Sequence, residues 1–281
     1  MKYLKLYNGV EIPLLGIGTF LVDNGEQTIK TIAHALENNY RLIDTSSRYY
    51  NEESIGAALK VSACNRNEVF ITTKLKSVNI TKEEFIKFVD TSLKKLQTNY
   101  IDLFLIHWPC PVDLNKNKEV WSWFEEYYEQ GVFRAIGVSN FNLEFLTNLV
   151  NRCKIKPMVN QIELHPGFQQ EELVQYCQNN EIAVMSYGAL MKGEVFNSPF
   201  KDTLEKIAQK YNKTIPQIIF RWGIEKNYIM IPKSVTPNRI AENIAVFDFN
   251  LTSEEHQLIK KLNQNKNVYL DPKDAMLWIV K

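Results

Sequence analysis

The sequence has no long hydrophobic run and no excess of either charge. It contains no stretch approaching the roughly 20 consecutive apolar residues that a membrane-spanning helix needs. The first ten residues, MKYLKLYNGV, interrupt their apolar positions with Lys and Asn, so they lack the continuous core of a secretory signal. The 33 Lys and Arg residues nearly balance the 32 Asp and Glu residues, whereas proteins that coat nucleic acid are strongly basic. We therefore expect a cytoplasmic protein that binds neither membranes nor nucleic acid.

Cysteine is also scarce. The four cysteines, Cys64, Cys110, Cys153 and Cys177, are far apart and form no C-x-x-C pair. Zinc sites and redox motifs place cysteines in close pairs, and disulfide scaffolds contain many more of them. The sequence therefore predicts no metal site and a reducing compartment.

What the chain does have is enough apolar sequence for a large core. Hydrophobic residues make up 45% and charged residues 23% of its 281 positions, which is typical of a globular protein. This length suits either two domains of roughly 150 residues or one α/β barrel of around 250. Because no Pro/Gly/Ser-rich linker or charge block divides the chain, we expect residues 1–281 to form a single domain.

Short runs rich in β-branched and aromatic residues recur along the whole chain, each followed by a longer stretch with helix signals. The eight runs are 14–19, 41–44, 69–73, 101–106, 133–138, 157–162, 182–186 and 228–231. Most start about 25 to 32 residues apart, the length of one strand, one helix and two loops. The repeat predicts an α/β fold, a closed (β/α)8 TIM barrel.

Capping and turn signals support this reading. Thr81 with Glu84, and Thr252 with Glu255, form capping boxes, and Pro216 suits the first turn of a further helix. After the first box, one apolar face is predicted from Phe85, Ile86, Val89, Leu93 and Leu96. Ahead of the first barrel strand, YLKLYNGVEIP alternates around Asn8-Gly9, which predicts a β-hairpin able to cover one end of the barrel.

A doubly wound open sheet is the alternative fold, because Gly16 and Gly18 form a G-x-G. Leu21 occupies the third glycine position, however, and the next helix signal begins only near Gly25. The barrel is therefore favoured.

Four reactive side chains follow three consecutive predicted strands. Asp44 ends the second run and Tyr49 lies in its loop, while Lys74 and His107 follow the third and fourth. Taken singly, each has an ordinary structural role as a helix cap, a rim aromatic, a solvated cation or a packed imidazole. Barrel enzymes, however, build their sites from the carboxyl ends of strands, so their joint placement favours function.

The chemistry of these groups is complementary. A phenol has an ordinary pKa near 10, and a neighbouring cation such as Lys74 would stabilise its phenolate. On that ground we expect the pKa of Tyr49 to be lowered, with Asp44 keeping Lys74 charged and His107 directing a substrate carbonyl. The set suits carbonyl reduction with a hydride supplied from elsewhere.

Six motifs in order and spacing resemble the aldo-keto reductase family: IDTSSRYYNEESIG (43–56), ITTKL (71–75), LIHWP (105–109), GVSNF (137–141), VNQIELHP (159–166) and IPKSVTPNRIAEN (231–243). The resemblance covers nearly the whole chain and is nearest to microbial and protozoan members akin to 2,5-diketogluconate reductases and prostaglandin F synthases. It implies the same barrel, a catalytic tetrad of Asp44, Tyr49, Lys74 and His107, and substrate contacts from Tyr49, His107 and Trp108.

The resemblance also implies NADPH/NADP+ as cofactor. The matching cofactor positions are Gly18, Thr19, Phe20, Asp44, Ser139, Asn140, Gln161, Tyr187, Gly188, Leu190, Lys233, Ser234, Arg239, Glu242 and Asn243. Polar groups of the fifth and sixth strands suit a nicotinamide carboxamide, Tyr187 offers an aromatic face for the ring, and Lys233 with Arg239 suits a 2′-phosphate. Alternatively, Ser139 and Asn140 cap a helix starting near Leu143, and the basic residues form a solvated turn.

Three positions, in two places along the chain, depart from the family pattern. Gly188-Ala189-Leu190 stands where Ser-Pro-Leu is usual, so the loop over the pyrophosphate is expected to differ in shape, and Ser46 replaces a common Ala. Neither change removes a reacting group. The resemblance also implies that the C-terminal tail shapes the substrate pocket.

The first functional hypothesis is a monomeric, NADPH-dependent reductase of small aldehydes and ketones. A second is a barrel that binds the cofactor for a regulatory or structural role with little turnover. A third is a barrel acting on sugar phosphates, which would use the basic loop after the eighth strand but leaves Tyr49, Lys74 and His107 unexplained.

Overall fold

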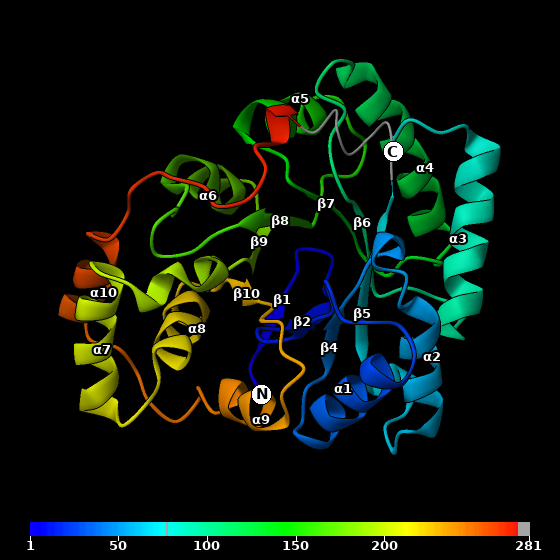
Figure 1. Cartoon of the computed structure of the whole chain (residues 1–281). Coiled ribbons are helices and arrows are strands. Elements are labelled where there is room, and N and C mark those ends of the chain that lie inside the picture. Colours follow the sequence, from blue (N-terminus) through cyan, green and yellow to red (C-terminus); the bar gives the residue numbers. More distant parts are fainter. Residues whose placement is uncertain (77, 275–281) are drawn as a thin grey trace.

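Eight parallel strands lie side by side in chain order (Figure 1). The computed structural model describes residues 1–76 and 78–274. The barrel strands are β3 (Ile17–Gly18), β4 (Leu42–Asp44), β5 (Phe70–Leu75), β6 (Leu103–Ile106), β7 (Ile136–Ser139), β8 (Val159–Glu163), β9 (Ala183–Tyr187) and β10 (Ile229–Met230). Each strand overlaps one of the eight predicted runs.

The sheet closes where its last strand meets its first. Leu15 forms a parallel bridge with Met230. The Gly16 amide donates to the Met230 carbonyl at 2.8 Å, and the Met230 amide donates to the Leu14 carbonyl at 2.9 Å. The open, doubly wound alternative is therefore wrong, and the predicted (β/α)8 barrel is confirmed.

Helices surround the strands on the outside of the ring (Figure 1). They are α1 (Glu26–Glu37), α2 (Glu52–Val61), α3 (Lys82–Leu96), α4 (Leu114–Glu129), α5 (Leu143–Val150), α6 (Glu171–Asn179), α7 (Phe200–Tyr211), α8 (Ile215–Glu225), α9 (Pro237–Ile244) and α10 (Ser253–Lys260). Across the described ranges, no helix combines the length and the apolar character that crossing a membrane requires.

The predicted helix starts are confirmed. The Thr81 hydroxyl accepts from the Glu84 amide, and the Glu84 carboxylate accepts from the Thr81 amide. The Thr252 box opens α10 in the same way, and Pro216 lies in the first turn of α8. One detail is wrong: Ile86 is 37% exposed. Adjacent helical positions differ by about 100° around the axis, so a face centred on Phe85 and Val89 turns Ile86 outward.

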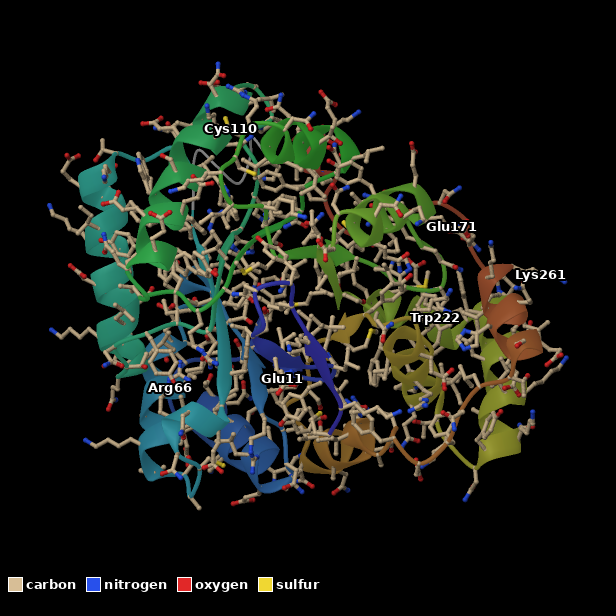
Figure 2. The ribbon with its side chains drawn as sticks, turned by 180° about the vertical axis from the view of Figure 1, so that it is seen from behind. Glu11, Arg66, Cys110, Glu171, Trp222 and Lys261 are labelled. Carbon is tan, nitrogen blue, oxygen red and sulfur yellow. The ribbon has the colours of Figure 1, made fainter. Side chains whose placement is uncertain are left out.

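The predicted N-terminal hairpin also forms. Strands β1 (Tyr3–Lys5) and β2 (Glu11–Pro13) pair antiparallel, and Gly9 takes a φ of 89° in the connection, where a residue with a Cβ would be strained. The Asn8 amide donates to the Arg134 carbonyl at 2.9 Å, just before β7 begins. The hairpin lies within the ring of elements in Figure 1, and Figure 2 shows Glu11 of β2 near the centre from behind. It covers the end of the barrel at which the strands start.

Aromatic packing holds the outer layer to the strands near the site. Phe104 of β6 stacks on Phe133 with ring centroids 4.4 Å apart and meets Phe124 of α4 at 4.9 Å. Such pairs contribute about 0.5–1.5 kcal/mol beyond the burial of their surface. They fix β6, and therefore the position at which His107 leaves the barrel.

Candidate active site

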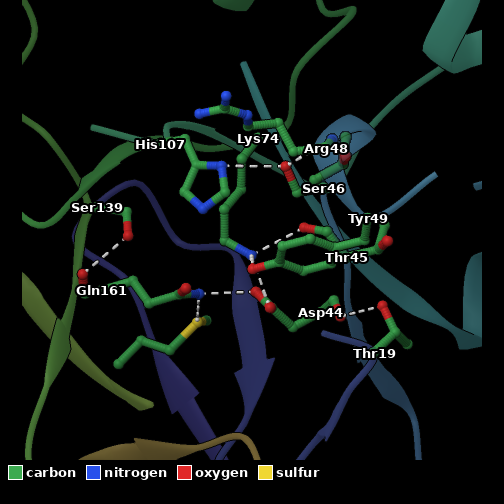
Figure 3. Close-up of polar contacts among 12 residues, drawn as sticks. Thr19, Asp44, Thr45, Ser46, Arg48, Tyr49, Lys74, His107, Ser139 and Gln161 are labelled. Atoms are coloured by element: carbon green, nitrogen blue, oxygen red, sulfur yellow. Dashed lines mark hydrogen bonds and ion pairs between the residues drawn. The ribbon is translucent and has the colours of Figure 1, made fainter. Parts of the chain in front are cut away.

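Three neighbouring strands deliver reactive side chains to one end of the barrel (Figure 3). Asp44 ends β4, Lys74 lies near the end of β5, and His107 directly follows β6. Tyr49 closes a short 3₁₀ turn, Ser47–Tyr49, that follows β4. Parallel strands finish at the same rim, so residues separated widely in sequence converge there.

Asp44 and Lys74 form a buried ion pair. The Lys74 Nζ lies 2.7 Å from Asp44 Oδ1, and their side chains are 0% and 4% exposed. Gln161 donates to the other carboxylate oxygen at 2.7 Å, and Lys74 also donates to the Thr45 carbonyl at 2.8 Å. Burial raises the pKa of Asp44 and lowers that of Lys74, and the pairing opposes both shifts.

Tyr49 is the third member of this cluster. Lys74 Nζ donates to its phenolic oxygen at 3.4 Å. Burial raises the pKa of Tyr49 well above its ordinary value, and the negative charge of Asp44 adds to the shift. The expectation of a lowered Tyr49 pKa is therefore wrong, because Asp44 offsets the charge of Lys74 and burial disfavours a phenolate. In this structure, Tyr49 is a firmly protonated phenol.

His107 presents one ring nitrogen to a serine and the other to the cluster. Its Nδ1 lies 3.1 Å from the Ser46 hydroxyl, and Figure 3 shows the other nitrogen directed toward Tyr49 and Lys74. The Tyr49 and His107 rings meet edge to face at 5.8 Å. Burial lowers the pKa of His107 well below its ordinary value, and the nearby Lys74 and Arg48 charges add to the effect. The imidazole is neutral at neutral pH.

The polar residues of β7 and β8 face the same space. The Ser139 hydroxyl donates to the Gln161 carbonyl at 3.1 Å, and the Asn140 amide donates to the His107 carbonyl at 2.9 Å. The Tyr187 hydroxyl donates to Asn140 Oδ1 at 2.7 Å. Because Asn142 caps α5, the alternative that Ser139 and Asn140 cap that helix is wrong.

A cavity of about 400 Å³ joins these groups to the loop after β10. Its walls include most of the residues predicted to bind cofactor or substrate: Gly18, Phe20, Asp44, Tyr49, His107, Trp108, Ser139, Asn140, Gln161, Tyr187, Gly188, Leu190 and Lys233. Phe20 lies 5.1 Å from the Tyr49 ring, and Trp108 lies beside His107 with ring centroids 6.4 Å apart. Together these residues enclose a continuous chamber beside the tetrad.

The remaining predicted residues lie outside the walls of this cavity. Thr19 is buried and its hydroxyl donates to the Asp44 carbonyl at 3.0 Å. Ser234 accepts from the Thr236 amide at 3.1 Å, and Glu242 accepts from the Thr214 hydroxyl at 2.8 Å. Asn243 is buried in α9, and Arg239 is exposed on its first turn. Thr19 therefore lies behind Asp44, and the other four residues lie in the loop after β10 or on α9.

A C-terminal segment, residues 267–271, also borders the site, and the sequence analysis did not identify its contacts. Both Glu163 carboxylate oxygens accept main-chain amides from it, Val268 at 2.6 Å and Tyr269 at 3.2 Å. The Tyr269 ring packs edge to face on Tyr187 at 5.4 Å. A Cβ at Gly188 would lie 2.6 Å from that ring, which gives a physical reason for the glycine that departs from the family pattern.

Lys192 adds a cation to the same wall. It donates to the Val268 carbonyl at 2.6 Å and lies 4.4 Å from the centre of the Tyr269 ring. A larger hollow of about 790 Å³ lies alongside and shares Asn140, Tyr187 and Leu270 with the first. Residues 275–281, the end of the tail expected to shape the pocket, lie outside the described residues. Within residues 1–76 and 78–274, no group of three or more His, Cys, Asp or Glu residues is placed to hold a metal ion.

Comparisons of this sequence and this structure with known proteins all find reductases or members of one reductase family. A model of the aldo/keto reductase family matches residues 14–264. The glyoxal reductase of Bacillus subtilis (strain 168) is 40% identical over 273 residues, covering 97% of each chain. The methylglyoxal reductase DkgA of Escherichia coli (strain K12) is 41% identical over 271 residues, covering 96% of each. A crystal structure of a Gox0644 mutant in complex with NADPH superposes with a TM-score of 0.91 at 33% identity, covering 98% of each chain.

Proposed function

This chain belongs to the aldo/keto reductase family, and we propose that it reduces small aldehydes and ketones to alcohols with NADPH, using Tyr49 as the proton donor. The observation that carries the proposal is the contact of Lys74 with both Asp44 and Tyr49 beside the cavity. A protonated phenol, a charged ammonium and a neutral imidazole are thereby grouped at one point.

The residues present fit the proposed cofactor. One cavity runs from Asp44 and Tyr49, past Tyr187, to Lys233. Beyond Lys233, the N-cap residue of α9 makes no capping hydrogen bond through its side chain, and Arg239 lies on the first turn of this helix. Free amides at a helix start and flanking cations favour a phosphate group. We assign the Tyr187 end to the nicotinamide and the Lys233 and Arg239 end to the 2′-phosphate.

When bound, NADPH supplies the hydride for reduction. The protein groups must then hold the carbonyl and provide one proton. We assign the tautomer in which the Ser46 hydroxyl donates to Nδ1 of the neutral His107, which leaves the imidazole proton on Nε2, the nitrogen directed toward Tyr49 in Figure 3. His107 therefore donates a hydrogen bond to the carbonyl oxygen and orients it beside the Tyr49 hydroxyl.

The proton transfer itself uses Tyr49. As negative charge develops on the carbonyl oxygen, the Tyr49 hydroxyl gives up its proton to it, and the product is an alcohol. The resulting phenolate is stabilised by the Lys74 ammonium 3.4 Å away. Asp44 accepts from Lys74 on the far side and keeps that ammonium oriented. Solvent then returns a proton to Tyr49.

The test is a rate measurement on the purified protein. We expect NADPH absorbance to fall on addition of glyoxal, methylglyoxal or 4-nitrobenzaldehyde, because relatives named for the first two compounds match nearly the whole chain. NADPH binding by fluorescence with no consumption for any carbonyl would instead support the cofactor-binding role. Failure to bind NADPH would overturn the assignment altogether.

A further inference from the structure

Asn51 is the N-cap residue of α2, two positions after the proposed proton donor, and it is fully buried. An asparagine at a helix start ordinarily accepts a hydrogen bond from an amide of the first turn. Among the described residues, the Asn51 side chain makes no such capping bond. Its Oδ1 accepts from the Thr45 hydroxyl at 2.8 Å, and its Nδ2 donates to the Thr19 and Val22 carbonyls at 2.9 and 3.2 Å. The side chain therefore joins the loop after β3 to the loop after β4.

The bond to Thr45 connects Asn51 with the lysine of the site. The Thr45 amide donates to the Thr72 carbonyl at 2.8 Å, and the Thr45 carbonyl accepts from Lys74 Nζ at 2.8 Å (Figure 3). The remaining polar group of Thr45, its hydroxyl, is the donor to Asn51. Because Lys74 Nζ also lies 3.4 Å from the Tyr49 hydroxyl, the placement of the Thr45 carbonyl helps to fix the ammonium relative to the phenol.

Each of the two loops that Asn51 joins contains a residue with a strained backbone. Leu21, between the two residues whose carbonyls accept from Asn51, has a φ of 57°, and so does Tyr50, the residue before Asn51. Both side chains are exposed, so their burial does not account for this conformation. A positive φ is unfavourable for a residue with a Cβ and persists where surrounding contacts hold it. Next to these positions are Phe20 and Tyr49, whose rings lie 5.1 Å apart.

We propose that Asn51 is a positioning residue for the proton donor, Tyr49. Through Thr45 it fixes the Lys74 ammonium beside the phenol, and through the loop after β3 it holds Phe20 against the phenol ring. This inference rests on the proposed reductase function. Asn51 lies outside the described walls of the cavity, so it acts through these neighbours. Geometry of this kind matters because a displacement of about 1 Å at a reacting group can cost roughly 100-fold in rate.

The first test removes the amide. We expect Asn51→Ala to lower kcat for 4-nitrobenzaldehyde roughly 10- to 100-fold, because the phenol and the ammonium are no longer held together. The Kd for NADPH, by fluorescence titration, should stay within about twofold of wild type. The solvent deuterium isotope effect on kcat should become larger than in wild type, because a displaced Tyr49 makes proton transfer limit the rate. A smaller fraction of folded enzyme would lower kcat but leave this isotope effect unchanged.

Thr45→Val tests the route from Asn51 to Lys74. Valine keeps the shape of threonine and removes the hydroxyl that donates to Asn51. This variant should lose less kcat than Asn51→Ala, because the bonds to the loop after β3 remain, and its solvent isotope effect should also rise. The double variant should be no slower than Asn51→Ala, since both changes break the same link. Additive losses would overturn the route through Thr45.

Asn117→Ala is the matched control. Asn117 is a second buried asparagine that bonds to a loop at the same end of the barrel. Its Oδ1 accepts from the Cys110 amide at 2.7 Å, and its Nδ2 donates to the Cys110 carbonyl at 3.1 Å. This variant should lose stability in urea as Asn51→Ala does, while its kcat and its solvent isotope effect should match wild type.

The outcomes distinguish the two proposals. If Asn51→Ala keeps the kcat and the solvent isotope effect of wild type, or changes them no more than Asn117→Ala does, the positioning role is overturned and the reductase function stands. A wild type that consumes no NADPH would overturn the reductase function, and this inference with it. If Asn51→Ala does not fold, Thr45→Val decides: a raised solvent isotope effect supports the positioning role, and an unchanged one overturns it.

Discussion

The two ends of the barrel each contain a buried aspartate in an ion cluster, and they differ in the partners they use. Asp44, at the end where strands finish, is paired with Lys74, which contacts Tyr49. Asp102, just before β6 begins, is 1% exposed and is paired with Arg66 and Arg134, both at 2.7 Å. One cluster contains a phenol beside a lysine, and the other contains guanidiniums.

That difference separates chemistry from stability. Guanidinium groups hold a carboxylate through planar hydrogen bonds of fixed geometry, so the Asp102 cluster is suited to joining segments of the chain. The Asp102 carboxylate also accepts a hydrogen bond from the Ile71 main-chain amide at 3.0 Å. The side-chain amide of the hairpin residue Asn8 donates to the Arg134 main-chain carbonyl. The Asp102 cluster ties strands and loops together, whereas the Asp44 cluster lies beside a cavity and contacts the phenol proposed as the proton donor.

Tyr49→Phe should give the largest effect, and it should appear only in catalysis. Removing the proposed proton donor is expected to lower kcat by about 10² to 10⁴-fold, the usual contribution of a general acid. The ring and its packing remain, so NADPH affinity and the urea unfolding midpoint should match wild type. Near-normal turnover would mean that another group delivers the proton.

Asp102→Asn tests the other end of the barrel, where the strands start, and should affect stability instead of catalysis. Breaking a buried ion cluster costs about 3–5 kcal/mol. The low end applies because the Arg66 and Arg134 side chains are 21% and 44% exposed and can regain water. We expect a loss of about 3 kcal/mol in the free energy of unfolding by urea titration, with kcat and KM unchanged. A large fall in kcat without destabilisation would contradict the division between the two ends.

Arg239→Met tests whether cofactor affinity can be lowered without slowing the reaction, at the end of the barrel where the strands finish. Arg239 is exposed in this structure, so its hydrogen bond to a phosphate should contribute a free energy at the low end of the range for charged groups. We therefore expect the Kd for NADPH to rise roughly tenfold. The Kd for NADH and the maximal rate at saturating NADPH should stay near wild type. Equal losses for both cofactors would rule out a 2′-phosphate contact.

The pH profile should give the smallest change. A phenol with a raised pKa remains protonated further into the alkaline range, and an imidazole with a lowered pKa remains neutral further into the acid range. We therefore expect kcat/KM for 4-nitrobenzaldehyde to vary by less than about twofold between about pH 6.5 and 9.5. An alkaline fall centred below about pH 10, present in wild type and absent in Tyr49→Phe, would show that Tyr49 ionises early.

Local patterns predicted the scaffold and the convergence of Asp44, Tyr49, Lys74 and His107 at one end of the barrel, because each strand and helix signal spans only a few residues. The strand runs, the Thr81 capping box and the residues following β4, β5 and β6 are of this kind. The pKa of Tyr49 was mispredicted, because it depends on burial and on how far Asp44 offsets Lys74, quantities that a motif does not contain.

Long-range contacts escaped prediction for a different reason. Glu163 bonds to the main chain 105 residues away, and no local pattern near Val268 reports that contact. The physical reason for Gly188, a φ of 70° and the Tyr269 ring against it, is likewise a property of the assembled structure. The Ser46 hydroxyl lies beside His107 Nδ1, a contact between residues 61 positions apart that the local motif does not contain.

The way Glu163 holds residues 267–271 has a consequence for how such an enzyme can diversify. Its carboxylate accepts main-chain amides, which every amino acid except proline provides, so the attachment is indifferent to the side chains of Val268 and Tyr269. Side chains on the attached segment can therefore be exchanged, in evolution or in engineering, while the path of the chain is kept. Tyr269 is also held by its ring, which packs on Tyr187 and lies against Gly188, so an exchange at this position alters those contacts while the main-chain attachment is kept.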